Sequence, residues 1–116
     1  AFGGCEVSKE MERRVTFVFD LDGTLCHTEG KRYGQAVPYV DRIARVNQLV
    51  AAGHRVVIDT ARGSGTGYDW YPMTVEQLAR WGCQYAALYV GSKTPGDVYI
   101  DDRAQIASEF FTHADA

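Results

Sequence analysis

The length, composition and charge of this chain are those of one ordinary globular domain. Its 116 residues are 46% apolar and 23% charged, which allows one hydrophobic core and excludes a disordered, collagen-like or coiled-coil protein. Fifteen acidic and twelve basic residues leave a net charge of −3, so no overall positive field attracts a nucleic acid. Because the sequence has no apolar run of about 20 residues and no signal-peptide pattern, we expect a cytoplasmic protein without membrane segments.

The first recognisable element is a strand at residues 15–20. Residues 1–14 are mostly polar or charged and have no sustained periodicity, so we expect a loose leader before a single domain that spans 15–116. The run VTFVFD at 15–20 is β-branched and aromatic, which is typical of a strand buried on both faces. Residues 21–36 contain three glycines and many small polar residues, which predicts a loop.

Three helices and three more strands follow along the chain. Pro38 stands where a helix would begin, apolar residues recur at helical spacing over 40–50, and Gly53 can end the helix in a left-handed conformation. RVVIDT at 55–60 predicts a second buried strand, and a glycine-rich loop follows at 61–72. The rest of the chain predicts a helix capped by Thr74 that ends near Gly82, strands at 85–90 and 97–101, and a short helix at 104–110.

This alternation of strands and helices predicts an α/β fold. Because the strands are continuously apolar, we expect a three-layer, Rossmann-like parallel sheet with helices on both faces and with the first strand in a central position. In such sheets, ligands bind beyond the carboxyl ends of the strands. The candidates for chemistry are therefore the polar residues that end or follow three of the strands: Asp20 with Asp22, Thr60, and Asp101 with Asp102.

The four aspartates predict a metal site. The first two flank one leucine and can face the same crevice, and the second two should reach the same rim. With no obvious basic neighbour, such a group of oxygen ligands suits Mg²⁺, although any single aspartate could instead cap a helix or form a turn. Thr60 adds a hydroxyl and Lys93 a compact cation, and an aspartate can form an aspartyl-phosphate. These residue types fit phosphoryl transfer.

Four segments resemble, in the same order, the motifs of the haloacid dehalogenase superfamily. FDLDGTL at 19–25 is similar to the first motif, IDTAR at 58–62 to the second, VGSKTPGD at 90–97 to the third, and YIDDRA at 99–104 to the fourth. The resemblance extends over essentially all of 15–110. It implies the fold of that superfamily and a Mg²⁺-dependent phosphatase that forms an aspartyl-phosphate intermediate.

The resemblance also implies a role for each residue of these motifs. Asp20 would be the nucleophile, and Asp22 would be the acid that protonates the leaving oxygen and then the base that activates water. Thr60 would hold phosphate oxygens, and Lys93 would neutralise the nucleophile and the phosphate. The implied metal ligands are Asp20, Asp22 through its main-chain carbonyl, and Asp101 with Asp102, of which either could bind the ion directly.

The gaps between these motifs are too short for a cap domain, so the resemblance implies a capless enzyme. It is similar to small phosphatases associated with capsule or surface-polysaccharide biosynthesis, which implies a phosphorylated sugar as substrate. Such an open site takes a bulky substrate or is covered by a second subunit, and we expect a homo-oligomer. Two alternatives stay open. One is a polynucleotide 3′-phosphatase, which the acidic balance disfavours, and the other is a non-catalytic regulatory module, which the presence of both Asp20 and Asp22 disfavours.

Arg62 and two loops are further candidates for substrate contact. Arg62 lies two residues after Thr60 and could fork onto a second anionic group of the substrate, or form a surface salt bridge. The GSGTG stretch at 63–67 lacks the lysine of a P-loop and is more typical of a flexible loop that touches substrate than of a phosphate cradle. The aromatic residues of the two loops could stack on a sugar or base, anchor the loops, or meet a second subunit: Tyr33, Tyr68, Trp70 and Tyr71.

Overall fold

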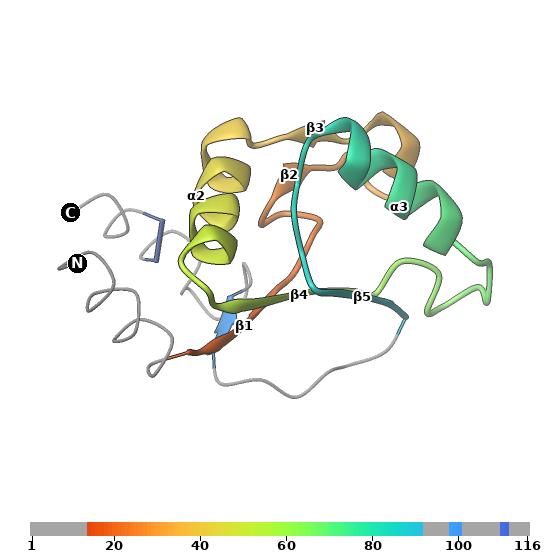
Figure 1. Ribbon diagram of the computed structural model, residues 1–116. Coiled ribbons are helices and arrows are strands. Elements are labelled where there is room, and N and C mark those ends of the chain that lie inside the picture. Colours follow the sequence, from red (N-terminus) through yellow and green to blue (C-terminus); the bar gives the residue numbers. More distant parts are fainter. Residues whose placement is uncertain (1–13, 92–97, 101–109, 112–116) are drawn as a thin grey trace, which may run out of the picture.

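A sheet of four parallel strands runs through the centre of the molecule (Figure 1). This computed structural model describes residues 14–91, 98–100 and 110–111. The strands are β1 (Thr16–Phe19), β4 (Arg55–Thr60), β5 (Ala87–Val90) and β6 (Val98–Ile100), and they lie in the order β5-β4-β1-β6. The predictions of a parallel α/β sheet and of an interior position for the first strand are confirmed.

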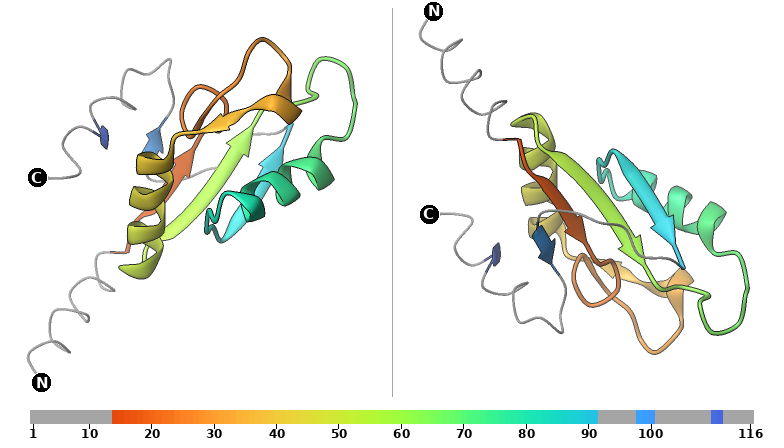
Figure 2. Two further views of the ribbon diagram at one scale, coloured as in Figure 1. Left: turned by 90° about the horizontal axis from the view of Figure 1, so that it is seen from above. Right: turned by 90° about the horizontal axis from the view of Figure 1, so that it is seen from below.

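Both long helices cover the same face of the sheet. α2 (Val40–Ala51) connects β1 to β4, and α3 (Tyr71–Arg80) connects β4 to β5, as the views from above and below show (Figure 2). Each connection advances one strand in the same direction, so right-handed crossovers place both helices on one side. The prediction of helices on both faces is therefore not met by the residues that the structure describes. Most of the third predicted helix, at 104–110, lies outside them.

The hydrophobic core lies between this face of the sheet and the helices. Side chains alternate along a strand, so Val56 and Ile58 of β4 point to the helices and Val57 points to the opposite face. All three are fully buried, which explains why this strand is continuously apolar. Val56 and Ile58 share this core with residues of every other strand of the sheet and of both helices: Phe19 from β1, Ile43, Val46 and Leu49 from α2, Leu78 from α3, Leu88 from β5 and Ile100 from β6.

A small hairpin occupies part of the segment that was predicted to be a loop. β2 (Cys26–His27) pairs antiparallel with β3 (Val37–Pro38), and a 3-10 turn, η1 (Tyr33–Gln35), lies between them. The expected start of the helix at Pro38 is wrong, because this proline lies in β3, where a two-stranded ribbon tolerates a residue without an N–H donor. α2 ends as predicted, with Gly53 in the left-handed conformation at a φ of 93°.

α3 begins earlier than predicted, at Tyr71. Pro72 lies in the first turn, where its fixed φ favours the helix and its missing N–H has no partner to lose. Thr74, predicted as the cap, therefore lies inside the helix, and its hydroxyl donates to the main-chain oxygen of Trp70 at 2.7 Å. This correction places a hydroxyl on the buried side of α3.

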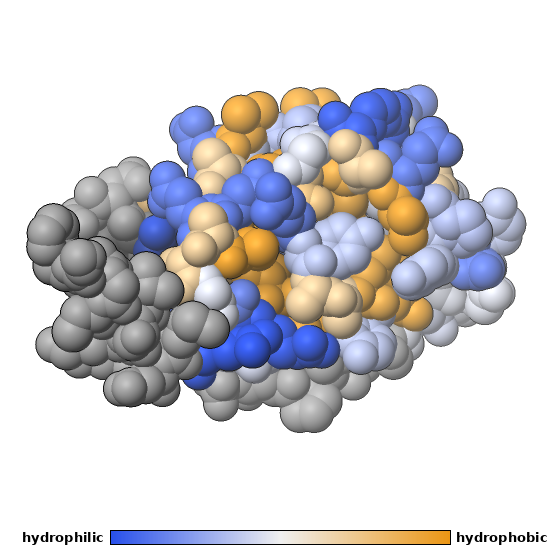
Figure 3. Space-filling view, viewed as in Figure 1, coloured by the Kyte–Doolittle hydropathy of each residue, from blue (hydrophilic) through white to orange (hydrophobic). Residues whose placement is uncertain are grey.

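The surface seen in the direction of Figure 1 is mixed in polarity. Hydrophilic and apolar side chains lie next to each other on it in the space-filling view (Figure 3). Val40, at the start of α2, is 71% exposed. Among the helices of the described part of the chain, none combines the length and the apolar character that a membrane span requires.

Truncation of a core side chain should reveal the packing between α3 and the sheet. Leu78 is 0% exposed, so Leu78→Ala should lower the free energy of unfolding by about 2–5 kcal/mol, because it removes buried apolar surface and leaves a cavity. Val40→Ala is the control, and it should change this free energy by less than about 0.5 kcal/mol. Urea unfolding followed by circular dichroism measures both variants. If both substitutions lowered the free energy of unfolding equally, the packing of Leu78 between α3 and the sheet would be contradicted.

Candidate functional site

Three of the predicted site residues lie at the carboxyl ends of neighbouring strands. Asp20 follows β1, and its main-chain N–H donates to the main-chain oxygen of Ile100 in β6 at 2.9 Å. Thr60 ends β4, on the other side of β1, and Asp22 lies two residues beyond Asp20. The structure therefore brings these three residues to one edge of the sheet. Arg62, predicted to contact substrate, follows Thr60 by two residues, whereas three predicted site residues lie outside the described part of the chain: Lys93, Asp101 and Asp102.

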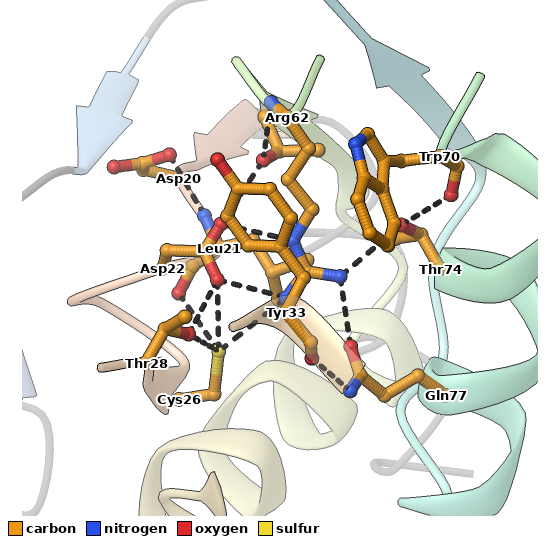
Figure 4. A network of polar contacts seen from close by, with 11 residues as sticks. Asp20, Leu21, Asp22, Cys26, Thr28, Tyr33, Arg62, Trp70, Thr74 and Gln77 are labelled. Atoms are coloured by element: carbon orange, nitrogen blue, oxygen red, sulfur yellow. Dashed lines mark hydrogen bonds and ion pairs between the residues drawn. The ribbon is translucent and has the colours of Figure 1, made fainter. Parts of the chain in front are cut away.

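The two aspartates of the first motif point in different directions (Figure 4). The carboxylate of Asp20 accepts a hydrogen bond from the main-chain N–H of Leu21 at 2.9 Å, and the residue is partly exposed. The carboxylate of Asp22 turns towards the side chains of Arg62 and Thr28. Two aspartates separated by a single leucine therefore have different surroundings.

Several donors hold the carboxylate of Asp22. Arg62 donates to both of its oxygens, at 2.9 Å from Nε and at 2.8 Å from a terminal nitrogen. The hydroxyl of Thr28 donates to the same carboxylate at 2.6 Å, and that of Thr60 donates to it at 3.4 Å. A forked contact of this kind fixes the direction of a carboxylate as well as its charge.

Arg62 is enclosed by the protein. Its side chain is 0% exposed, and its second terminal nitrogen donates to Thr74 Oγ1 at 3.2 Å and to Gln77 Oε1 at 2.8 Å. The guanidinium carbon lies 4.9 Å from the centre of the Tyr33 ring. The expected surface salt bridge is therefore wrong, and so is the expectation that the aspartates have no basic neighbour. A buried guanidinium requires a carboxylate partner, and Asp22 provides it. A contact with substrate would require Arg62 to leave these partners.

The contacts of Arg62 connect the site to α3. Gln77 accepts from Arg62 through Oε1 and donates through Nε2 to the main-chain oxygen of Tyr33 at 2.8 Å. Thr74 accepts from Arg62 while it donates to the helix backbone. Sequence analysis missed both helix residues. The available signal was that they lie at three-residue spacing beside Leu78 on the buried side of the helix, where apolar residues are expected.

Burial and hydrogen bonding act on the pKa of Asp22 in opposite directions. Burial raises this pKa, but the hydrogen bonds from Arg62 and Thr28 lower it more, and the result lies below the ordinary value of 3.8. Asp22 is therefore ionised at neutral pH. Beside it, burial raises the pKa of the Cys26 thiol to about 11, so this cysteine stays protonated and is a poor nucleophile.

The described residues offer some of the oxygen donors that a metal site would need. No group of three or more His, Cys, Asp or Glu side chains within the described ranges is arranged to hold a metal. Asp20 has a carboxylate at this edge, and the motif resemblance implies that Asp22 would contribute its main-chain carbonyl, while its carboxylate is paired with Arg62. Phe19 and Ile100 are register partners, and an aspartate follows each of them in the sequence, Asp20 and Asp101. These oxygen donors fit a hard cation such as Mg²⁺.

Comparison with known proteins supports the fold. No protein-family model matches the chain, and no curated protein matches it. A crystal structure of a target protein from Vibrio cholerae is similar, with a TM-score of 0.61 and 27% sequence identity. The alignment covers 85% of this chain and 94% of that chain. The α/β architecture therefore occurs in a solved structure.

Replacing Arg62 with methionine tests whether the buried ion pair holds the site together. Asp22, Thr74 and Gln77 would lose a charged donor, so the free energy of unfolding should fall by about 3 kcal/mol. Arg80→Met is the matched control, because Arg80 is exposed on α3 and forms no ion pair with any residue that the structure describes. Urea unfolding compares the two variants. If they are equally stable, the ion pair does not support the fold.

The charge of Asp22 should also make stability depend on acidic pH. Because its pKa is lower in the folded than in the unfolded chain, ionised Asp22 stabilises the fold above about pH 4, and this contribution disappears as pH falls through the folded-state pKa. In Arg62→Met, burial still raises the pKa of Asp22 but the arginine no longer lowers it, so this pKa should rise. NMR titration of the Asp22 carboxyl carbon measures both values. A wild-type pKa above the ordinary value would contradict the ion pair.

Proposed function

We propose that the protein is a phosphomonoester hydrolase that forms an aspartyl-phosphate on Asp20. The observation that carries this proposal is the contrast between two aspartates at one strand end, because Asp20 is partly exposed while Asp22 is fixed and ionised beside a buried arginine. Carboxylates in such different environments suit different chemical roles. The resemblance of 19–25 and 58–62 to the first two motifs of the haloacid dehalogenase superfamily supports the same function, and with it the Rossmann-like fold of that superfamily.

In the first step, a carboxylate oxygen of Asp20 attacks the phosphorus atom of the substrate. The bond from phosphorus to the leaving oxygen breaks, its electron pair stays on that oxygen, and an aspartyl-phosphate forms. The hydroxyl of Thr60 ends the neighbouring strand and is available to hold a phosphate oxygen. The negative charge of the bound substrate raises the pKa of Asp22, which takes up a proton from solvent and then delivers it to the leaving oxygen.

In the second step, a water molecule attacks the phosphorus atom. The bond from phosphorus to Asp20 breaks and releases the free carboxylate, while Asp22 accepts the proton that the water loses. This step needs an ionised Asp22, which is the state that Arg62 favours. The products are inorganic phosphate and the alcohol that left in the first step.

A divalent cation and three further residues belong to the same proposal. Mg²⁺, when bound, would supply positive charge that balances the phosphate. We propose that Asp20 and the main-chain carbonyl of Asp22 hold it together with Asp101 and Asp102, and that Lys93 adds a cation beside the phosphate. These three residues enter through the motif resemblance, since they lie outside the described part of the chain.

The open edge of the site suits a phosphorylated sugar and a second subunit. The segments 20–39 and 61–70 form a small hairpin and a loop, which are too short to make a cap domain. Tyr68 is 65% exposed and Tyr71 is 47% exposed, and exposed aromatic rings of this kind are enriched at protein interfaces. We therefore propose that these rings meet a second copy of the chain, which would cover the site.

Asparagine variants of the two aspartates test the mechanism. Asp20→Asn should abolish hydrolysis of p-nitrophenyl phosphate, because an amide is a poor nucleophile of almost the same size. Asp22→Asn should lower kcat by about 10²- to 10⁴-fold, the usual contribution of acid–base catalysis. Addition of EDTA should stop the wild-type reaction, and Mg²⁺ should restore it.

The control for these variants is Asp41→Asn, an exposed aspartate in the first turn of α2, which should keep wild-type activity. Near-normal turnover by Asp20→Asn would rule out the covalent intermediate. The same assay with sugar phosphates and with 3′-phosphorylated oligonucleotides separates the proposed function from a polynucleotide phosphatase. If activity is confined to the oligonucleotides, the substrate is a 3′-phosphorylated nucleic-acid end and not a sugar phosphate.

A further inference from the structure

An open pocket lies beside the proposed site, between the loop after β4 and the loop before η1. Its volume is about 140 Å³, and the residues with functional side chains that line it are Lys31, Tyr33, Ser64, Thr66, Tyr68 and Trp70. Pockets for drug-sized ligands are roughly 300–1,000 Å³, so this one has room for a single small ring. We propose that it binds the acidic sugar ring that carries the phosphate, an inference that rests on the proposed phosphatase function.

Aromatic rings form one side of the pocket. The ring of Trp70 lies edge-to-face with that of Tyr33 at 5.0 Å between centroids, and with that of Tyr68 at 4.8 Å. Two hydroxyl side chains, Ser64 and Thr66, lie among the other lining residues. A sugar ring needs both kinds of surface, because its C–H groups pack on aromatic faces and its hydroxyls need hydrogen-bond partners.

The loop on the other side of the pocket has a backbone conformation that requires glycine. Gly63 has a φ of 83°, and a Cβ there would lie 2.2 Å from the main-chain oxygen of Tyr68 and 2.9 Å from the Trp70 ring. The main-chain N–H of Gly67 donates back to the oxygen of Gly63 at 2.8 Å. The aromatic wall and the glycine loop therefore pack on each other, so the pocket exists before a ligand arrives.

Lys31 gives the pocket its preference for an acid. Its side chain is exposed and lines the pocket, and it forms no ion pair with any residue in the described ranges. A single ammonium group beside aromatic rings favours a ligand that combines a ring with one negative charge. A sugar carboxylate, as in a uronic acid, has this combination. A neutral sugar would gain no charge attraction from the ammonium.

Tyr33 joins the pocket to the proposed catalytic residues. Its ring lines the pocket and also lies over the guanidinium of Arg62, which holds Asp22. Ala61 lines the pocket as well, and it directly follows Thr60 at the end of β4. A phosphate at Thr60 and a sugar ring in the pocket would therefore be neighbours, as they are in one sugar phosphate.

A binding experiment tests this inference without any catalytic step. The chain has two tryptophans, so Trp81→Phe leaves Trp70 as the only fluorescent indole, in the wall of the pocket. We expect free glucuronic acid to change this fluorescence in a saturable way, with a Kd at least about tenfold below that of glucose. In the same background, Lys31→Gln should remove the difference between the two sugars. Arg32→Gln, an exposed neighbour, is the matched control and should keep it.

The outcomes distinguish this inference from the proposed function. Equal binding of both sugars by the Trp81→Phe protein, or loss of the difference between them in Arg32→Gln as in Lys31→Gln, would overturn the acidic-sugar pocket even if p-nitrophenyl phosphate is hydrolysed. Selective binding of glucuronic acid by a protein that hydrolyses no phosphate ester would support the pocket and reject the phosphatase. If both hold, Lys31→Gln should raise KM for glucuronic acid 1-phosphate about tenfold, and the control Arg32→Gln should leave this KM at the wild-type value.

Discussion

A buried guanidinium is the constraint on which the candidate site depends. The side chain of Arg62 has no exposed surface, and a charge in that position destabilises a fold unless a carboxylate is paired with it. Asp22 supplies the carboxylate, while Thr74 and Gln77 accept from the second terminal nitrogen of Arg62. Asp22 lies in the segment after β1, whereas Thr74 and Gln77 lie in α3. The contacts of Arg62 therefore fix both this segment and α3 to the loop after β4.

The same contact separates the chemistry of two aspartates that are two positions apart. Arg62 and Thr28 hold Asp22 ionised and fix its direction, whereas Asp20 stays partly exposed at the edge of the sheet. An ionised carboxylate suits a base that activates water, so the interaction that stabilises the fold also prepares the second step of the proposed reaction. The role of Asp22 as the acid in the first step then depends on the negative charge of the bound substrate, which raises the pKa of Asp22.

Selection of the substrate and catalysis would share one aromatic side chain. Tyr33 covers the guanidinium on one side and belongs to the wall of the pocket on the other. Its main-chain oxygen accepts from Gln77, so its position depends on the same network that holds Asp22. A change in the pocket wall is therefore expected to reach the ion pair, because both are packed around this residue.

By itself, the sequence determined the local features and the class of the fold. The strand at 55–60 has the predicted bounds and Gly53 ends its helix as predicted, because apolar runs and left-handed glycines act within a few residues. The same pattern placed Asp20 and Asp22 at a strand end. Only the tertiary structure decided that both helices share one face and that Arg62 pairs with Asp22. Arg62 and Asp22 are 40 positions apart in the sequence. Local sequence patterns do not indicate which distant residues the crossover connections bring together.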